Sequence, residues 1–123
     1  METRPFQFTG RIRSFGHAIA GIIRMVRCQH NAWIHSVATV GVAVIGFYVE
    51  LVRWEWCMLA FAIGLVWMAE ALNTAIEFLA DEVSLEKREL IGKAKDAASA
   101  GVLIAAICSV VIGLLVFVPH FLK

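Results

Sequence analysis

The chain is too apolar to fold as a water-soluble domain. It has 123 residues, of which 60% are hydrophobic and 17% are charged, and its mean hydropathy is +0.77; soluble domains average about 45–50% apolar and about 25% charged. A soluble chain of this length would expose large apolar patches and aggregate. The composition excludes a soluble enzyme, a nucleic-acid-binding protein and a disordered linker. It indicates one small integral membrane domain over residues 1–123.

The near-neutral charge hides an uneven distribution along the chain. Eleven Lys and Arg residues and ten Asp and Glu residues give a formal net charge of +1, so no polyanionic partner is indicated. Five of the bases lie in the first 27 residues, and seven of the acids lie between Glu70 and Asp96. The three cysteines fit neither a disulfide framework nor a metal site, and we expect them to be buried thiols. They are Cys28, Cys57 and Cys108.

Residues 6–27 predict an amphipathic helix. Large apolar residues recur at three- and four-residue steps, from Phe8 and Ile12 to Ile23 and Val26, and arginines punctuate the rest. This pattern is typical of a helix that lies in the plane of a membrane interface. The alternative is a soluble helix that packs on a partner. The segment lacks the apolar core and cleavage site of a signal peptide, so we expect no cleaved leader.

Three further stretches are long enough to cross a bilayer as helices. They lie at residues 32–49, 56–79 and 97–118. The first and third contain no acids or bases, whereas the second contains Glu70 and Glu77, which are costly in hydrocarbon. Pro119 is expected to end the third helix. The chain thus predicts an all-α membrane fold of three transmembrane helices plus the N-terminal surface helix.

The positions of the basic residues predict the orientation of the chain in the membrane. Five bases in the N-terminal segment and four in the 80–97 loop fall on one side, which leaves Arg53 and Lys123 on the other. Because cytoplasmic loops are enriched in Lys and Arg, the N-terminus is expected in the cytoplasm and the C-terminus outside. Trp54 and Trp56 fit an aromatic belt at the outer turn.

The second span carries a polar stripe. Glu70, Asn73, Thr74, Glu77 and Asp81 stand 0, 3, 4, 7 and 11 positions along the chain from the first of them. At about 100° per residue they share one sector of a helix. Single polar residues in a span often serve as interhelical contacts, but two carboxylates, an amide and a hydroxyl on one face favour function. The acids fit three roles: binding a divalent cation, accepting a proton, or carrying protons in transport.

The third span opens with polar residues that face the same membrane surface. Lys95, Asp96 and Ser99 cluster near one helix face at the cytoplasmic end. A lysine beside carboxylates can form a structural ion pair, or it can bind phosphate. Acidic residues on one helix and a lysine on the next suit Mg²⁺ together with a polyphosphate, because carboxylate oxygens hold the metal and the ammonium group binds phosphate oxygens.

Two sequence strings carry a family resemblance. The string E-A-L-N-T-A-I-E at 70–77 and the string K-A-K-D at 93–96 strongly resemble the prokaryotic diacylglycerol kinase family, which includes the undecaprenol kinases. The resemblance extends over nearly the whole chain, including residues 30–35 at the start of the first span. It implies a homotrimeric helical bundle in the bacterial inner membrane, with active sites shared between protomers. It also implies phosphorylation of a membrane lipid hydroxyl at the cytoplasmic interface, with ATP as donor and Mg²⁺ as cofactor.

The resemblance also implies roles for individual residues. By motif position, Glu70 is the catalytic base that contacts the lipid, and Asn73 supports it. Glu77 is a metal ligand that also contacts the nucleotide. Ser99 falls where the family contacts lipid. The remaining nucleotide-binding positions are His17, Gln29, Glu86, Lys87, Arg88, Lys95 and Asp96.

One departure from the family pattern concerns the metal. The family often has a second metal-binding Glu where this chain has Gln29, which offers a carbonyl oxygen without charge. Three outcomes are open: Gln29 is a weaker metal ligand, Asp81 or the nucleotide supplies the missing ligand, or activity is impaired. Because the rest of the motif is intact, we expect an active enzyme. We expect His30 and His35 to form interfacial hydrogen bonds rather than bind metal, and His120 to be a solvated tail residue.

Two other classes of protein remain as alternatives. A small proton-coupled transporter would also use a membrane-embedded acid such as Glu70. A catalytically impaired regulatory membrane subunit is supported by Gln29 alone. No Walker A string is present, so side chains and metal would have to hold the phosphates. The lipid itself stays open: diacylglycerol, giving phosphatidic acid, is the default, and undecaprenol, giving undecaprenyl phosphate, is close behind.

Overall fold

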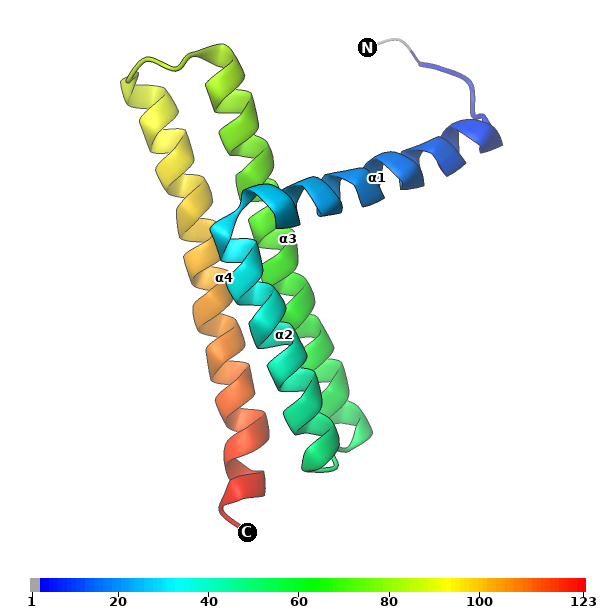
Figure 1. Ribbon diagram of the computed structural model, residues 1–123, viewed down its shortest axis with the longest axis vertical. Coiled ribbons are helices and arrows are strands. Elements are labelled where there is room, and N and C mark those ends of the chain that lie inside the picture. The colour runs from blue at the N-terminus through cyan, green and yellow to red at the C-terminus, as the bar shows by residue number, and fades with distance from the viewer. Residues whose placement is uncertain (1–2) are drawn as a thin grey trace.

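The structure, a computed structural model, describes residues 3–123 and is all-helical over that range. Its four helices are α1 (Phe8–Cys28), α2 (His30–Tyr48), α3 (Arg53–Val83) and α4 (Glu89–Phe121), and residues 3–123 contain no strand. Figure 1 shows α2, α3 and α4 as a bundle, with α1 projecting sideways from one end of α2. The all-α prediction is confirmed.

Three of the helices are long and apolar enough to cross a membrane. These are α2, α3 and α4, with 19, 31 and 33 residues. α2 begins two residues before the predicted span 32–49 and ends one residue short of it, whereas α3 and α4 contain the predicted spans 56–79 and 97–118 and extend beyond them. Their polar ends stay helical because residues such as Lys, Glu and Ala are good helix formers, and Lys93 pairs with Glu89 one turn away at 2.9 Å.

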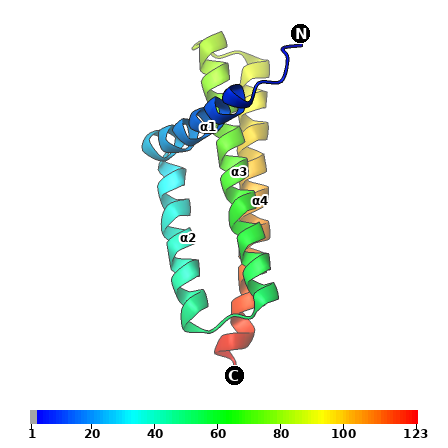
Figure 2. The same ribbon diagram turned by 90° about the vertical axis from the view of Figure 1, so that its right-hand side faces the viewer.

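The helices place the chain's two charged regions at one end of the bundle. The α3–α4 loop lies at that end, and α1 leaves α2 on the same half of the molecule (Figures 1 and 2). The α2–α3 turn and the C-terminus lie at the opposite end. α3 and α4 pack along their length, whereas α2 packs more lightly on α3, and α1 contacts both α2 and α3.

A tight turn joins α2 to α3. The Leu51 N–H donates to the Gly46 carbonyl at 3.2 Å, and the Glu50 N–H donates to the Phe47 carbonyl at 3.4 Å. This is the Schellman pattern that ends many helices. The motif needs one residue in the left-handed region, and Glu50 takes it with φ 58°, although glycine is the usual residue there.

Gly46 allows the turn to pack closely. A Cβ atom at this position would lie 2.7 Å from the ring of Trp56 and 3.0 Å from Leu51. Leu51 also belongs to a small core with Leu59 and Val116. Outside this core most large apolar side chains of α2 and α4 are exposed on the single chain, which suits surfaces that face lipid or other chains.

Three expectations about individual residues are wrong. Pro119 lies inside the last turn of α4, which continues to Phe121, because a proline so close to the end disturbs only one turn. His120 is not a free tail residue; its Nε2 lies 2.9 Å from Oε1 of Glu55 on α3. The three cysteines are free but exposed on the single chain, because a thin bundle leaves the outer faces of its helices uncovered.

Candidate active site

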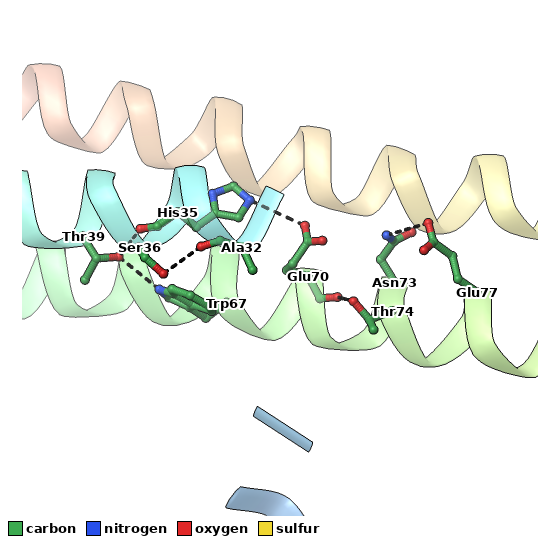
Figure 3. A network of polar contacts seen from close by, with 9 residues as sticks. All are labelled: Ala32, His35, Ser36, Thr39, Trp67, Glu70, Asn73, Thr74 and Glu77. Carbon is green, nitrogen blue, oxygen red and sulfur yellow. Dashed lines mark hydrogen bonds and ion pairs between the residues drawn. The ribbon is translucent and has the colours of Figure 1, made fainter. Parts of the chain in front are cut away.

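The polar stripe of α3 passes from buried to exposed along the helix. Glu70 is fully buried, with 0% of its surface exposed, and Asn73 and Thr74 are buried beside it. Glu77 is half-buried and Asp81 is exposed. Figure 3 shows Glu70, Asn73 and Glu77 in succession along one side of the helix, with Thr74 one turn from Glu70 and hydrogen-bonded to its backbone carbonyl. The stripe therefore starts in the bundle interior and ends at the surface near the α3–α4 loop.

Glu70 is a buried carboxyl group whose side-chain oxygens have no hydrogen-bond donor. Neither oxygen forms a hydrogen bond with any described residue. Thr74 lies one turn away, but its hydroxyl donates to the Glu70 backbone carbonyl at 2.9 Å, not to the carboxylate. The nearest basic group is His35 of α2, whose Nε2 lies 3.5 Å from Oε2 of Glu70 and points toward it in Figure 3. A buried carboxyl group in this condition is costly for stability and is typical of a functional site.

Two amide groups orient the Glu77 carboxylate. Gln29 Nε2 donates to Oε2 at 3.1 Å, and Asn73 Nδ2 donates to Oε1 at 3.3 Å. Gln29 lies between α1 and α2, so this contact ties the start of the bundle to α3. The Oδ1 atom of Asn73 is buried and has no hydrogen-bond donor.

This group of oxygens fits a magnesium ion. The carboxylate of Glu77 and the amide oxygens of Asn73 and Gln29 are hard ligands, and Mg²⁺ is commonly held by one or two carboxylates plus substrate phosphates. Among residues 3–123 no group of three or more His, Cys, Asp or Glu side chains could hold a metal. The phosphates of a nucleotide would therefore have to complete the coordination.

A second group of charged residues lines a surface hollow at the α3–α4 loop. Five of the predicted nucleotide-binding residues line it: Glu86, Lys87, Arg88, Lys95 and Asp96. The ammonium group of Lys95 also lies 2.7 Å from Oδ1 of Asp81 on α3. The structure thus brings these five residues together, and the ion pair links their hollow to the exposed end of the stripe.

The structure does not bring every candidate residue into these groups. His17 is exposed on α1 and Ser99 is exposed on α4. Neither forms a hydrogen bond or ion pair with Glu70, Glu77 or Lys95 within the described chain. Both would need a neighbouring chain or a bound substrate to take part.

Sequence reasoning missed the partner of Glu70. It assigned His35 to interfacial hydrogen bonding and gave no role to Thr39 or Trp67. The indole N–H of Trp67 donates to Thr39 Oγ1 at 3.0 Å, and the Thr39 hydroxyl donates to the His35 carbonyl at 2.6 Å. The helical spacing of His35 and Thr39 was visible in the sequence, but nothing there indicated which face of α2 meets α3.

The fold and this site define a small helical membrane protein with a buried acid next to a charged surface hollow. A family model for prokaryotic diacylglycerol kinase matches residues 16–117. The chain therefore belongs to the prokaryotic diacylglycerol kinase family. It is an enzyme of the lipid kinase class.

Three relatives illustrate the similarity. The chain is 40% identical over 107 residues to the undecaprenol kinase of Bacillus subtilis (strain 168), with 87% of each chain covered. It is 32% identical over 128 aligned positions to the diacylglycerol kinase of Escherichia coli (strain K12), with 98% and 99% covered. It is 36% identical over 111 residues to the diacylglycerol kinase of Synechocystis sp., with 89% of this chain and 63% of that protein covered.

Proposed function

We propose that the chain transfers the γ-phosphoryl group of ATP to a membrane lipid hydroxyl, with Mg²⁺ as cofactor. The observation that carries this proposal is the pairing of a buried acid, Glu70, with an oriented carboxylate, Glu77, on one helix. The two lie seven residues apart, about 10 Å along the helix axis. One end of the stripe can therefore meet a lipid headgroup while the other end meets nucleotide phosphates.

Glu70 is the proposed general base. As the lipid oxygen bonds to the γ-phosphorus, its proton passes to a Glu70 oxygen, and the bond to the ADP oxygen breaks with its electron pair. Both Glu70 oxygens are free of hydrogen bonds, so they can accept this proton. Phosphoryl transfer depends mainly on positioning and charge neutralisation, and a buried, fixed acid supplies the first of these.

Glu77, Gln29 and Asn73 are the proposed metal-binding group, and Lys95 with its neighbours is the proposed nucleotide-binding group. Bound Mg²⁺ would supply positive charge to the phosphates. Glu77 is held for this role by two amide donors. Lys95, Lys87 and Arg88 lie around one hollow and can neutralise the remaining phosphate charge.

The surroundings of the site are part of the proposal. We propose that α1 is an amphipathic helix in the interface plane, because its Phe8, Ile12, Phe15 and Ile19 side chains are exposed. We further propose a homotrimer in the bacterial inner membrane, with the N-terminus in the cytoplasm and sites shared between protomers. His17 and Ser99, which make no hydrogen bond or ion pair with the site groups of their own chain, would then contact nucleotide and lipid.

The lipid is proposed to be undecaprenol in preference to diacylglycerol. The identity to the undecaprenol kinase, 40%, exceeds the identities of 32% and 36% to the two diacylglycerol kinases. Apolar side chains discriminate poorly between lipids of different chain length, so the test of the proposal should include both undecaprenol and diacylglycerol.

Radiolabel transfer from ATP into extracted lipid tests the proposal. Purified protein in detergent should label the lipid only when Mg²⁺ is present. Replacing Glu70 by Gln should lower the rate at least about a hundredfold, the usual contribution of a general base, without unfolding the protein. An active E70Q variant contradicts the assignment of the base. Proton-driven flux without ATP would instead indicate a transporter, and neither activity would indicate a regulatory subunit.

A further inference from the structure

The contact between α2 and α3 beside the site involves a histidine that the proposed reaction has not used. His35 faces Glu70 with its Nε2 atom 3.5 Å from Oε2. Its side chain is 16% exposed, while that of Glu70 is fully buried. The same Nε2 atom forms no hydrogen bond with any described residue. Each group is therefore the nearest partner that the other has.

His35 is the one basic side chain of the described residues within 4.0 Å of the Glu70 carboxylate. The lysines of α4 are engaged elsewhere, Lys93 with Glu89 and Lys95 with Asp81. The bases of α1, Arg24 among them, form no ion pair within the described chain. On α3 itself the next ionisable group toward the surface, Glu77, is two turns away and is also acidic.

The backbone and ring of His35 are held in place from α3. Its carbonyl accepts the Thr39 hydroxyl at 2.6 Å, and Thr39 in turn accepts the Trp67 indole N–H at 3.0 Å. The His35 and Trp67 rings pack edge to face, with centroids 6.2 Å apart. Trp67 stands three residues before Glu70 on the same helix, so one helix supplies both the acid and the group that fixes its partner (Figure 3).

A general base must lie within hydrogen-bond reach of the proton that it accepts, and the Glu70 carboxyl group forms no hydrogen bond within the described chain that would hold it in place. We propose that His35 is the positioning residue for Glu70: its ring lies against the buried carboxyl group and keeps it oriented for the lipid hydroxyl. This inference rests on the proposed function for its kinetic consequence, but not for the orientation of the carboxyl group.

The chain offers a matched control for testing this pair. His120 contacts Glu55 at 2.9 Å at the opposite end of the bundle, and both of those side chains are also largely buried, with 12% and 10% exposed. H35Q and H120Q therefore remove the same imidazole ring from the same kind of pair. The two differ in their distance from the proposed site.

The first measurement separates kcat from KM in lipid phosphorylation. In H35Q kcat should fall about tenfold to a hundredfold with the KM for ATP unchanged, because Glu70 loses the ring that orients it while the nucleotide-binding residues are untouched. H120Q should lose thermal stability with both constants unchanged. An H35Q enzyme that loses stability with kcat unchanged would give His35 a structural role alone and overturn the inference.

The second measurement does not need activity. The infrared carboxyl bands that are lost in E70Q report on Glu70, and H35Q should shift or broaden them, because the carboxyl group loses the ring that it faces; H120Q should leave them unchanged. If the wild-type protein phosphorylates no lipid, the proposed function fails while these bands still decide the inference. If H35Q does not fold, W67F, which replaces the indole by a phenyl ring and so removes the N–H that Thr39 accepts, should show a weaker form of the same change. Glu70 bands that are unchanged in both variants overturn the proposal.

Discussion

Four acidic residues of α3 differ in the side chains that they contact. Glu55 contacts His120, Glu70 faces His35, Asp81 pairs with Lys95, and Glu77 accepts two neutral amides. Only the last of these has no basic partner within 4.0 Å in the described chain. A carboxylate that is oriented but not neutralised is suited to receive a cation from solution, which separates Glu77 from the other three.

The replacement of Gln29 by Glu tests the hypothesis that Glu77 binds a cation. The new carboxylate would lie where an amide now donates at 3.1 Å, so a hydrogen bond is exchanged for like-charge repulsion. Without metal we expect a loss of about 1–3 kcal/mol of stability. Mg²⁺ should restore it, because ligand binding to the folded state stabilises that state. Thermal unfolding in detergent, with EDTA or with Mg²⁺, measures both effects.

Gln7 supplies the control for that experiment. It is exposed at the N-cap of α1, so Q7E adds the same charge away from Glu77. Its unfolding temperature should respond to Mg²⁺ as the wild type does. Equal Mg²⁺ responses of Q29E and Q7E would show that the Gln29 position does not reach the metal.

At the scale of elements, the α3–α4 hairpin carries the stripe and the charged hollow on one continuous pair of helices. Its ends are tied by two ion pairs, Asp81 with Lys95 near the loop and Glu55 with His120 at the far end. The first is exposed and the second is largely buried. Because exposed pairs contribute little stability, the Asp81–Lys95 pair could be exchanged for a ligand at little cost, as the proposed role of Lys95 requires.

Replacing Lys95 by Met should separate these contributions. The Asp81–Lys95 pair has side chains 40% and 51% exposed, so its loss should cost at most about 1 kcal/mol of stability. The KM for ATP should rise about tenfold or more, because a charged hydrogen bond to phosphate is lost. D81N removes the same ion pair but keeps the ammonium group, and it should retain ATP affinity. An equal loss in both variants would mean that the pair acts only as a structural tie.

The α2–α3 turn contains a residue in an unfavourable backbone conformation. Glu50 has φ 58°, a region that costs residues with a Cβ about 1 kcal/mol or more. E50G should therefore raise the unfolding free energy by about 1 kcal/mol, as measured by thermal or denaturant unfolding in detergent. E50A removes the charge but keeps the Cβ, and it should bring no such gain. If E50A stabilises as much as E50G, the charge and not the backbone is the cause.

At the scale of the whole molecule, the single chain leaves much of its apolar surface uncovered. Its buried core is small, and large apolar side chains are exposed along α2 and α4, among them Val40, Val44, Leu103 and Leu114. In a bilayer such side chains contact lipid instead of water, so their exposure carries no hydrophobic penalty. Other copies of the chain would cover them by close packing. The exposed positions of His17 and Ser99 fit packing against other copies of the chain, since both are candidate site residues that form no hydrogen bond or ion pair with the site groups of the described chain.

Mixing two impaired variants at a low ATP concentration tests whether sites are shared between chains. E70Q lacks the proposed base and K95M lacks the proposed nucleotide cation. If a site combines the α3 stripe of one protomer with the α4 residues of its neighbour, co-assembled E70Q and K95M should recover lipid phosphorylation. The same variants purified separately and mixed without subunit exchange are the control. No recovery after exchange would place each complete site within one chain.

The sequence by itself determined the features that depend on neighbours along the chain. Three apolar stretches long enough to span a membrane, the polar stripe from Glu70 to Asp81 and the family strings are all local patterns, and the structure confirms three apolar helices. Helix ends were less accurate, because polar flanks such as 80–83 and 89–96 continue a helix without any apolar signal.

Only the tertiary structure decided which side chains meet. His35 and Glu70 are 35 residues apart, Gln29 and Glu77 are 48 apart, and Glu55 and His120 are 65 apart. Periodicity shows which residues share a face of one helix, but it does not show how far that helix is rotated or shifted against the next. That packing decides which side chain a buried acid faces, so only the fold could show that Glu70 faces His35.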